Sequence, residues 1–263
     1  MVARLENLLK SIPLASGAHK TPADGVCVME CVAYLQGEPY SDHPECACPV
    51  ITAFVALSSD VISTPERQIL GKRILRIAGS RSTPDVAARR LYFLVAYVTR
   101  TALPRALSLA NLEACALPLT RLPDYTGEQL ASTYLAAIDA ARIAINDQFA
   151  SALEVPRAVV KARSLLDCAQ RMIADLAPCV RALGEGRSNR EMVRMLFGKT
   201  IGAASVAVGI FKGTVDRIAL VDALLDIGAA QRPDTPLPTL LNRAQLLAMQ
   251  ATQIPFHGPL PEA

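Results

Sequence analysis

Helix-start signals recur along this chain more clearly than any other local pattern. Residues 64–66 read Thr-Pro-Glu and residues 83–85 read Thr-Pro-Asp. Each triplet provides a capping hydroxyl, a proline at the first helical position and an acid in the first turn. Between such signals apolar residues recur at spacings of three and four, while strict alternation is almost absent. The pattern predicts an all-α fold, a compact multi-helix bundle of about nine to eleven helices.

The breaks between the periodic segments predict how the chain is organised. Expected helices cover residues 2–11, 24–36, 49–58, 65–78, 84–101, 105–116, 127–152, 156–174, 188–211, 214–230 and 238–250. The stretch 117–127 holds two prolines and a glycine and is expected to be a loop. We therefore expect a single helical domain, 1–263, with halves at 1–116 and 117–263 and an extended tail at 251–263.

Composition limits the classes of protein to consider. With 51% hydrophobic and 19% charged residues, the chain is too apolar to be disordered. A net charge of +3 and a pI near 8.5 are mild, which disfavours a nucleic-acid partner without excluding one. The apolar run at 200–211 is too short to cross a bilayer, so no membrane partner is expected. An odd number of cysteines and no export signal predict free thiols and a cytoplasmic protein.

Residues 19–48 form the most unusual part of the sequence. This window holds two of the three histidines and four of the seven cysteines. Within it, the expected helix 24–36 is apolar on nearly every side, with Asp24 as a plausible N-cap and Gly37 as its stop. Glu30 lies on this helix, and a carboxylate held inside a protein must be paired, hydrogen-bonded or protonated. We therefore expect Glu30 to meet groups from the polar loop that follows.

The same window resembles a known sequence signature. The motif runs Cys27-Val-Met-Glu30, then Gly37-Glu-Pro, then Ser41-Asp-His-Pro44, then Cys46. It resembles a family of uncharacterised proteins of actinobacteria and their phages, over about residues 17 to 60. Position 59 is serine where that family usually has asparagine. The resemblance implies a shared site in this window and an actinobacterial or phage origin, and it names no reaction.

Three interpretations of the window remain open. In the first, Cys27, Glu30, Asp42 and His43 perform acid–base or thiol chemistry, with the Cys27 pKa lowered near a helix N-terminus. In the second, Cys27, His43, Cys46 and Cys48 bind zinc, although their spacing is not a standard zinc pattern. In the third, the same residues are structural, with buried thiols and a Glu30 that caps or bridges the loop.

A basic stretch follows at residues 66–90, with seven basic residues against two acids. Its Gly-Ser-Arg-Ser-Thr segment at 79–83 opens onto an expected helix N-terminus, which together with an arginine could hold a phosphate. The candidate phosphate-binding residues are Ser80, Arg81, Ser82, Arg89 and Arg90. The competing interpretation is a solvated basic face with an ordinary capped turn.

Two functions from different classes follow from these observations. The first is an enzyme acting on a small phosphorylated or nucleotide-like substrate through the Cys/Glu/Asp/His cluster. The second is a non-catalytic phage or bacterial binding or assembly protein, homo-oligomeric and virion-associated if phage-encoded, in which the cluster is scaffolding. A buried Glu30 beside Cys27 and the His43 ring is the arrangement on which the first depends.

Overall fold

The computed structural model describes residues 1–151, 159–185, 217–228 and 235–251. The described residues are helical and contain no strand, which confirms the predicted all-α fold. The expected helix at 188–211 and nearly all of the expected tail at 251–263 lie outside these ranges. No helix in the described ranges is long and apolar enough to cross a membrane.

The chain forms two compact units, and each is described by itself. Unit 1 contains residues 1–81 and 221–263, and unit 2 contains residues 82–220. Unit 2 is thus an insertion between two segments of unit 1, and the division differs from the expected halves at residue 116. The reason is that the last helices of the chain pack with the first ones, which a reading along the sequence does not reveal.

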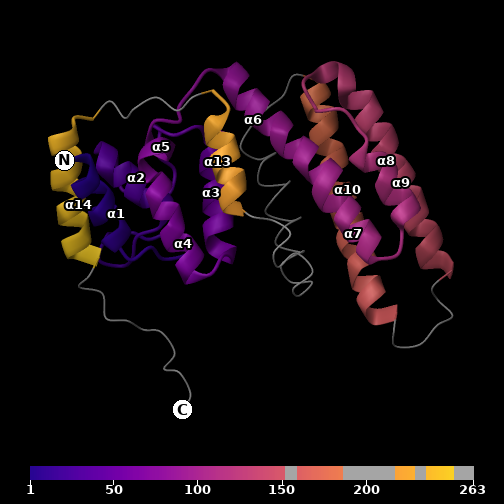
Figure 1. The fold of residues 1–263 in the computed structure, drawn as a ribbon, viewed down its shortest axis with the longest axis horizontal. Helices are drawn as coiled ribbons and strands as arrows, with labels where there is room; N and C mark the ends of the chain where they lie inside the picture. The colour runs from indigo at the N-terminus through magenta and orange to yellow at the C-terminus, as the bar shows by residue number, and fades with distance from the viewer. Residues whose placement is uncertain (152–158, 186–216, 229–234, 252–263) are drawn as a thin grey trace, which may run out of the picture. The chain divides into compact units, whose positions relative to one another are not determined.

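Unit 1 is built around one short central helix, α2 (Val28–Gln36). Its other helices are α1 (Val2–Ser11), α3 (Pro49–Val61), α4 (Thr64–Leu70), α5 (Ile74–Ala78) and α14 (Leu237–Ala251), together with the end of α13 (Arg217–Asp226). Helices α3, α5 and α14 pack against α2, and α1 packs against α14 (Figure 1). Seven of the nine residues of α2 are buried, which matches its apolar sequence on nearly every side.

The C-terminal end of α2 is fixed by Gly37 and by a contact from α14. Gly37 ends the helix in the left-handed conformation, with φ of 75°, and its N–H bonds to the carbonyls of Ala33 and Tyr34. The Arg243 guanidinium of α14 donates to the Leu35 carbonyl at 2.9 Å and fills the space that a side chain at position 37 would need. The expected stop at Gly37 is therefore confirmed. The helix begins later than expected, at Val28 rather than near Asp24.

Unit 2 contains α6 (Pro84–Tyr97), α7 (Leu103–Leu109), α8 (Glu113–Thr120), α9 (Ala131–Ser151) and α10 (Val159–Gly184), with α10 packed on α9 and α7. Helices α6 and α7 are joined by a π turn at Val98–Ala102. Pro104 has no N–H to give to the carbonyl of Arg100, which explains the wider turn.

Several expected boundaries differ from the structure, and the helix expected to end at residue 174 continues as α10 to Gly184. The expected helix 65–78 is divided into α4 and α5 by a 3₁₀ turn at Gly71–Arg73. The expected helix 105–116 breaks at Asn111, whose φ is +61°, and α8 then continues through Pro118 into the expected loop. A proline removes one hydrogen bond but does not end every helix, because packing of residues such as Leu119 compensates.

Candidate functional site

Glu30 is completely buried at the N-terminus of α2. Its Oε2 accepts a hydrogen bond from the Cys27 backbone N–H at 2.7 Å, and the Glu30 N–H points to Cys27 Sγ at 3.4 Å. The two residues form a capping box in which Cys27 takes the position usually held by serine or threonine. Asp24, the expected N-cap, instead accepts bonds from the N–H and hydroxyl of Thr21 at 3.0 and 2.8 Å.

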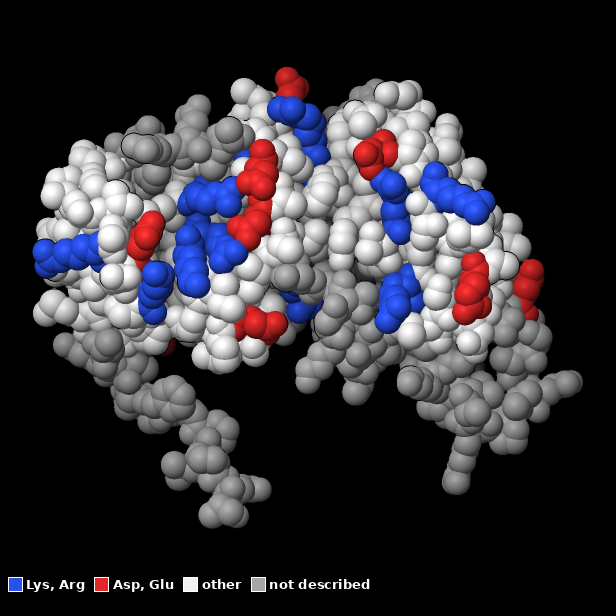
Figure 2. Space-filling view, viewed as in Figure 1, with Lys and Arg blue, Asp and Glu red and all other residues white. Residues whose placement is uncertain are grey.

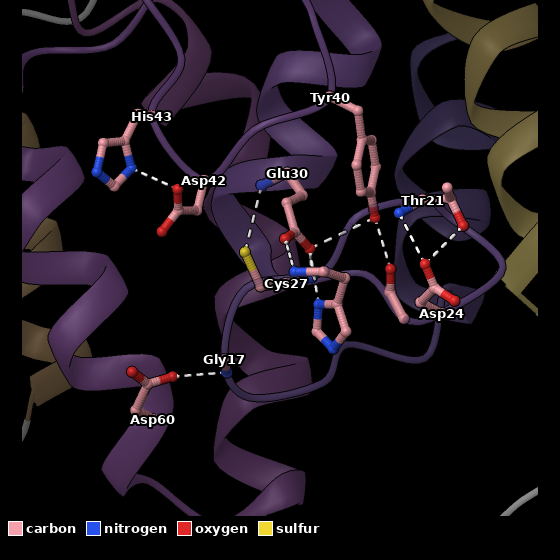
Figure 3. Close-up of polar contacts among 11 residues, drawn as sticks. Gly17, Thr21, Asp24, Cys27, Glu30, Tyr40, Asp42, His43 and Asp60 are labelled. Atoms are coloured by element: carbon pink, nitrogen blue, oxygen red, sulfur yellow. Dashed lines mark hydrogen bonds and ion pairs between the residues drawn. The ribbon is translucent and has the colours of Figure 1, made fainter.

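The histidine bound to Glu30 is His19. Its backbone N–H donates to Glu30 Oε1, and its ring Nδ1 lies 2.9 Å from Oε2. The Tyr40 hydroxyl donates to the Gly25 carbonyl at 2.6 Å and lies 3.4 Å from Oε2 (Figure 3). One buried carboxylate therefore joins the segment before α2, α2 itself and the loop after it.

The segment before α2 has further attachments. Ala15 donates its N–H to the Val26 carbonyl at 2.9 Å. Gly17 donates its N–H to Asp60 Oδ1 at 2.8 Å, which ties this segment to α3. These bonds explain how His19, which precedes Glu30 by 11 residues, reaches it.

The thiols near Glu30 are in the protonated form at neutral pH. Burial, with the Glu30 charge as a smaller contribution, raises the pKa of Cys27 to about 12. Burial also raises the pKa of Cys31. The expected lowering of the Cys27 pKa at a helix N-terminus is therefore wrong, because loss of solvent outweighs the favourable backbone N–H bonds.

His43 lies away from Glu30, on the loop that follows α2. Its Nδ1 is 2.5 Å from Asp42 Oδ1, and its backbone N–H donates to Ser41 Oγ at 3.1 Å (Figure 3). The side chains of His43 and Asp42 are 37% and 31% exposed, whereas Glu30 is fully enclosed. The four expected catalytic residues thus separate into a buried pair, Cys27 and Glu30, and a solvent-facing pair, Asp42 and His43.

We name residues 37–48 the recognition loop, and its conformation is held by a second carboxylate. Glu38 Oε2 and Oε1 accept the backbone N–H groups of Glu45 and Cys46 at 2.7 and 2.8 Å. This contact closes the loop on itself, so that the residues between its two ends are held in one arrangement. Burial raises the pKa of the half-buried Cys46 thiol to about 12, and the neighbouring Glu38 charge adds to the effect.

The end of the recognition loop is attached to the segment after α5. Ser80 Oγ accepts the Cys48 N–H at 3.0 Å. Arg81 donates its backbone N–H to the Cys46 carbonyl at 3.2 Å and its Nη1 to the Glu45 carbonyl at 3.1 Å. Two of the candidate phosphate-binding residues therefore serve as supports of this loop.

The candidate phosphate-binding residues differ in exposure. Ser80 is buried in unit 1, where Arg81 is exposed. In unit 2, Arg90 is completely buried and donates to Ser82 Oγ at 3.0 Å, while Arg89 is exposed. A phosphate in solvent can therefore reach the side chains of Arg81 and Arg89, but Ser80 and Arg90 have internal roles.

Other members of the basic stretch have acidic partners. Arg73 bonds both oxygens of Asp222 in α13, and Arg76 bonds Asp222 and Asp226. Figure 2 shows Lys or Arg side chains next to Asp or Glu side chains on this face of the molecule. Arg67 is buried and donates to backbone carbonyls at the end of α3. Of the five basic residues that the stretch contributes to unit 1, Arg73 and Arg76 are thus paired with acids.

The described residues contain no group of three His, Cys, Asp or Glu side chains close enough to hold a metal ion. All four expected zinc ligands are among them: Cys27, His43, Cys46 and Cys48. Cys27 and Cys48 are buried as small core side chains, while His43 is on the surface. The geometry therefore gives no support to the zinc interpretation.

Two residues of the Glu30 cluster were not predicted as site residues. His19 was in the histidine- and cysteine-rich window, and Tyr40 lies between the Gly37-Glu-Pro and Ser41-Asp-His-Pro44 parts of the loop signature. A general signal was present, since a buried carboxylate needs several donors and the polar segments on either side of α2 contain them. Spacing alone does not distinguish His19 from His43, which lie at similar separations from Glu30.

The fold and the cluster define an all-α protein in which one buried glutamate organises the segments around a central helix. The chain matches no family model, and comparison with curated proteins and with solved structures finds no match either. Any assignment of function therefore depends on the geometry alone.

Proposed function

We propose that this protein is a non-catalytic binding protein, that the recognition loop is its binding surface, and that the Glu30 cluster is the scaffold of that loop. The observation that carries the proposal is the complete burial of the Glu30 carboxylate, which accepts bonds from the backbone of Cys27 and from both the backbone and ring of His19. A reacting carboxylate must be reached by substrate, whereas a structural one is enclosed and fully bonded.

The exposed residues of the recognition loop are a second observation that supports a binding role. Asp42, His43 and Glu45 face solvent on a loop closed by Glu38 and attached to Arg81. Loops that are held by a rigid scaffold and carry exposed polar groups are common binding surfaces, because little conformational entropy is lost when a ligand binds.

The test is an NMR titration of the full chain that follows the signals of the recognition loop. The ligands are inorganic phosphate, AMP, acetate, single amino acids and short basic peptides. A saturable shift confined to the loop, lost in His43→Ala and retained in Lys72→Ala, supports the proposal. No saturable shift with any ligand contradicts it.

A second candidate function, acid–base catalysis, is favoured by the Asp42–His43 pair. Asp42 lies at Nδ1 of a part-exposed ring and Nε2 lies on the other side of that ring, which is the arrangement of a general base. Turnover of any phosphate or carboxylate ester that disappears in both His43→Asn and Asp42→Asn, with binding retained, would favour this candidate.

Sedimentation velocity tests the separate prediction of a homo-oligomer.

A further inference from the structure

Arg81 is held beside the recognition loop at two points, through its backbone N–H to Cys46 and its Nη1 to Glu45. A guanidinium has five N–H donors in a planar fork. Among the described residues the Glu45 carbonyl is the partner of this guanidinium, and the side chain is exposed. The bond to Glu45 fixes the position of the charge and leaves further donors for a ligand.

His43 presents a second polar group on the same short stretch of chain. Glu45 and Cys46, to which Arg81 is bonded, are two and three residues after His43. In Figure 3 one ring nitrogen of His43 points to Asp42 and the other points away from it. Nε2 therefore lies on the side of the ring away from the Asp42 pair.

The acidic residues nearby differ in how strongly they would repel an anion bound at Arg81 and His43. Asp42 is paired with His43, and the Glu38 carboxylate accepts two backbone N–H groups of the loop. Glu45 is exposed, and its own carbonyl accepts the bond from Arg81, so its negative charge is on the residue next to any anion bound there. Removing the Glu45 charge therefore provides a test that leaves the proposed ligand-binding groups intact.

We infer that the recognition loop binds the phosphate group of a small phosphorylated molecule, with the Arg81 guanidinium and the doubly protonated His43 ring as its donors. A guanidinium fork matches the oxygen geometry of a phosphate, and charge-assisted bonds of this kind are stronger than neutral ones. The inference rests on the proposed function, because it names the ligand class for the same surface.

The experiment is an NMR titration of the full chain with inorganic phosphate and, separately, with AMP, observing the His43 ring signals. The expected result is a saturable shift with both ligands, with binding roughly 10-fold weaker in Arg81→Ala, the size of one lost charge-assisted bond. Tighter AMP binding identifies a phosphate monoester as the preferred form, and equal binding identifies the phosphate group alone. Lys72→Ala, an exposed change in the same unit, is the matched control and should bind unchanged.

Two further variants keep the test decisive if Arg81→Ala disturbs the loop. Arg81→Lys keeps the charge but not the fork, and is expected to bind several-fold more weakly than the native chain. Glu45→Gln is expected to bind about 2- to 5-fold more tightly, because a nearby negative charge is removed. Unchanged affinity in both variants, or no saturable shift with either ligand, overturns the inference.

The outcome also separates this inference from the proposed function. If an amino acid or a basic peptide shifts the recognition loop while phosphate and AMP do not, the phosphate inference is wrong and the binding surface stands. If none of the ligands shifts the loop, both are wrong.

Discussion

The imidazole of His19 lies directly against the α-carbon of Gly25, in the space that a side chain at position 25 would occupy. Gly25 has a φ of +148°, a conformation that other residues rarely adopt. Its carbonyl accepts a hydrogen bond from the Tyr40 hydroxyl, so Gly25 contacts both His19 and Tyr40. The absence of a side chain at position 25 is therefore a condition for the Glu30 cluster.

Gly25→Ala is expected to lower the free energy of unfolding by roughly 2–4 kcal/mol, through backbone strain and displacement of the His19 ring. Urea unfolding followed by circular dichroism measures the change. Gly17→Ala is the matched control, since Gly17 has a φ of +82° but open space around its α-carbon. It should cost only about 1 kcal/mol. Equal losses in the two variants would show that the His19 contact contributes nothing.

Glu30→Gln is expected to destabilise unit 1 by roughly 2–4 kcal/mol, because an amide cannot accept all the bonds that the buried carboxylate accepts. Glu45→Gln, which changes an exposed acid of the recognition loop, should stay within about 0.5 kcal/mol of the native chain. Chemical unfolding of both variants provides the comparison. A Glu30→Gln variant as stable as the native chain would contradict the scaffold role and with it the proposed function.

The buried thiols predict a loss of stability at alkaline pH. Burial raises the pKa of Cys27 and of Cys179 to about 12, from an ordinary value of 9.0. Above pH 9 the unfolded chain releases protons that the folded chain keeps, so the stabilisation is complete below pH 9 and is lost as the pH rises toward 12. Urea unfolding between pH 7 and pH 10 in reductant should show this decline.

Cys27→Ser tests the contribution of one thiol to that decline. Serine can take over the N-cap position, so the variant should fold with similar stability at neutral pH. It has no group that titrates in this range, so its stability should fall less steeply above pH 9. A decline identical to that of the native chain would show that Cys27 does not contribute.

The ion pair between Arg73 and Asp222 predicts a loss of stability in acid. The Arg73 hydrogen bond is the main cause that lowers the pKa of Asp222 below its ordinary value of 3.8. The pair therefore stabilises the folded chain above that value, and the stabilisation is lost as the pH falls through the lower, folded-state pKa. Asp222→Asn should cost about 0.5–1 kcal/mol at neutral pH and should reduce the acid dependence of unfolding.

Asp226→Asn is the matched control for Asp222, because Asp226 bonds only Arg76 among the described residues and is 72% exposed. Its replacement should have a smaller effect on stability at neutral pH. Equal losses of stability in the two variants would show that the bonds to Arg76, rather than the Arg73–Asp222 pair, stabilise the folded chain.

Much of the helical structure could be predicted from local sequence. The proline-led starts of α3 and α6, the stop of α2 at Gly37 and the burial of Glu30 all depend on residues within about one turn of one another. The expected cap of α4 was wrong, since Ser63 rather than Thr64 is its N-cap and the helix begins one residue before Pro65. The helix boundaries near Gly71 and Asn111 were missed, because weak local preferences there yield to packing.

The partners of these residues could not be predicted in the same way. His19 and His43 lie at similar distances from Glu30 along the chain, and the path fixed by Gly25, Val26 and Asp60 brings His19 to it. Arg73 finds Asp222 across 149 positions, where no periodicity operates. Caps and amphipathic spacing act over three or four residues and can be read from the chain, whereas pairing between distant residues follows from how the helices pack.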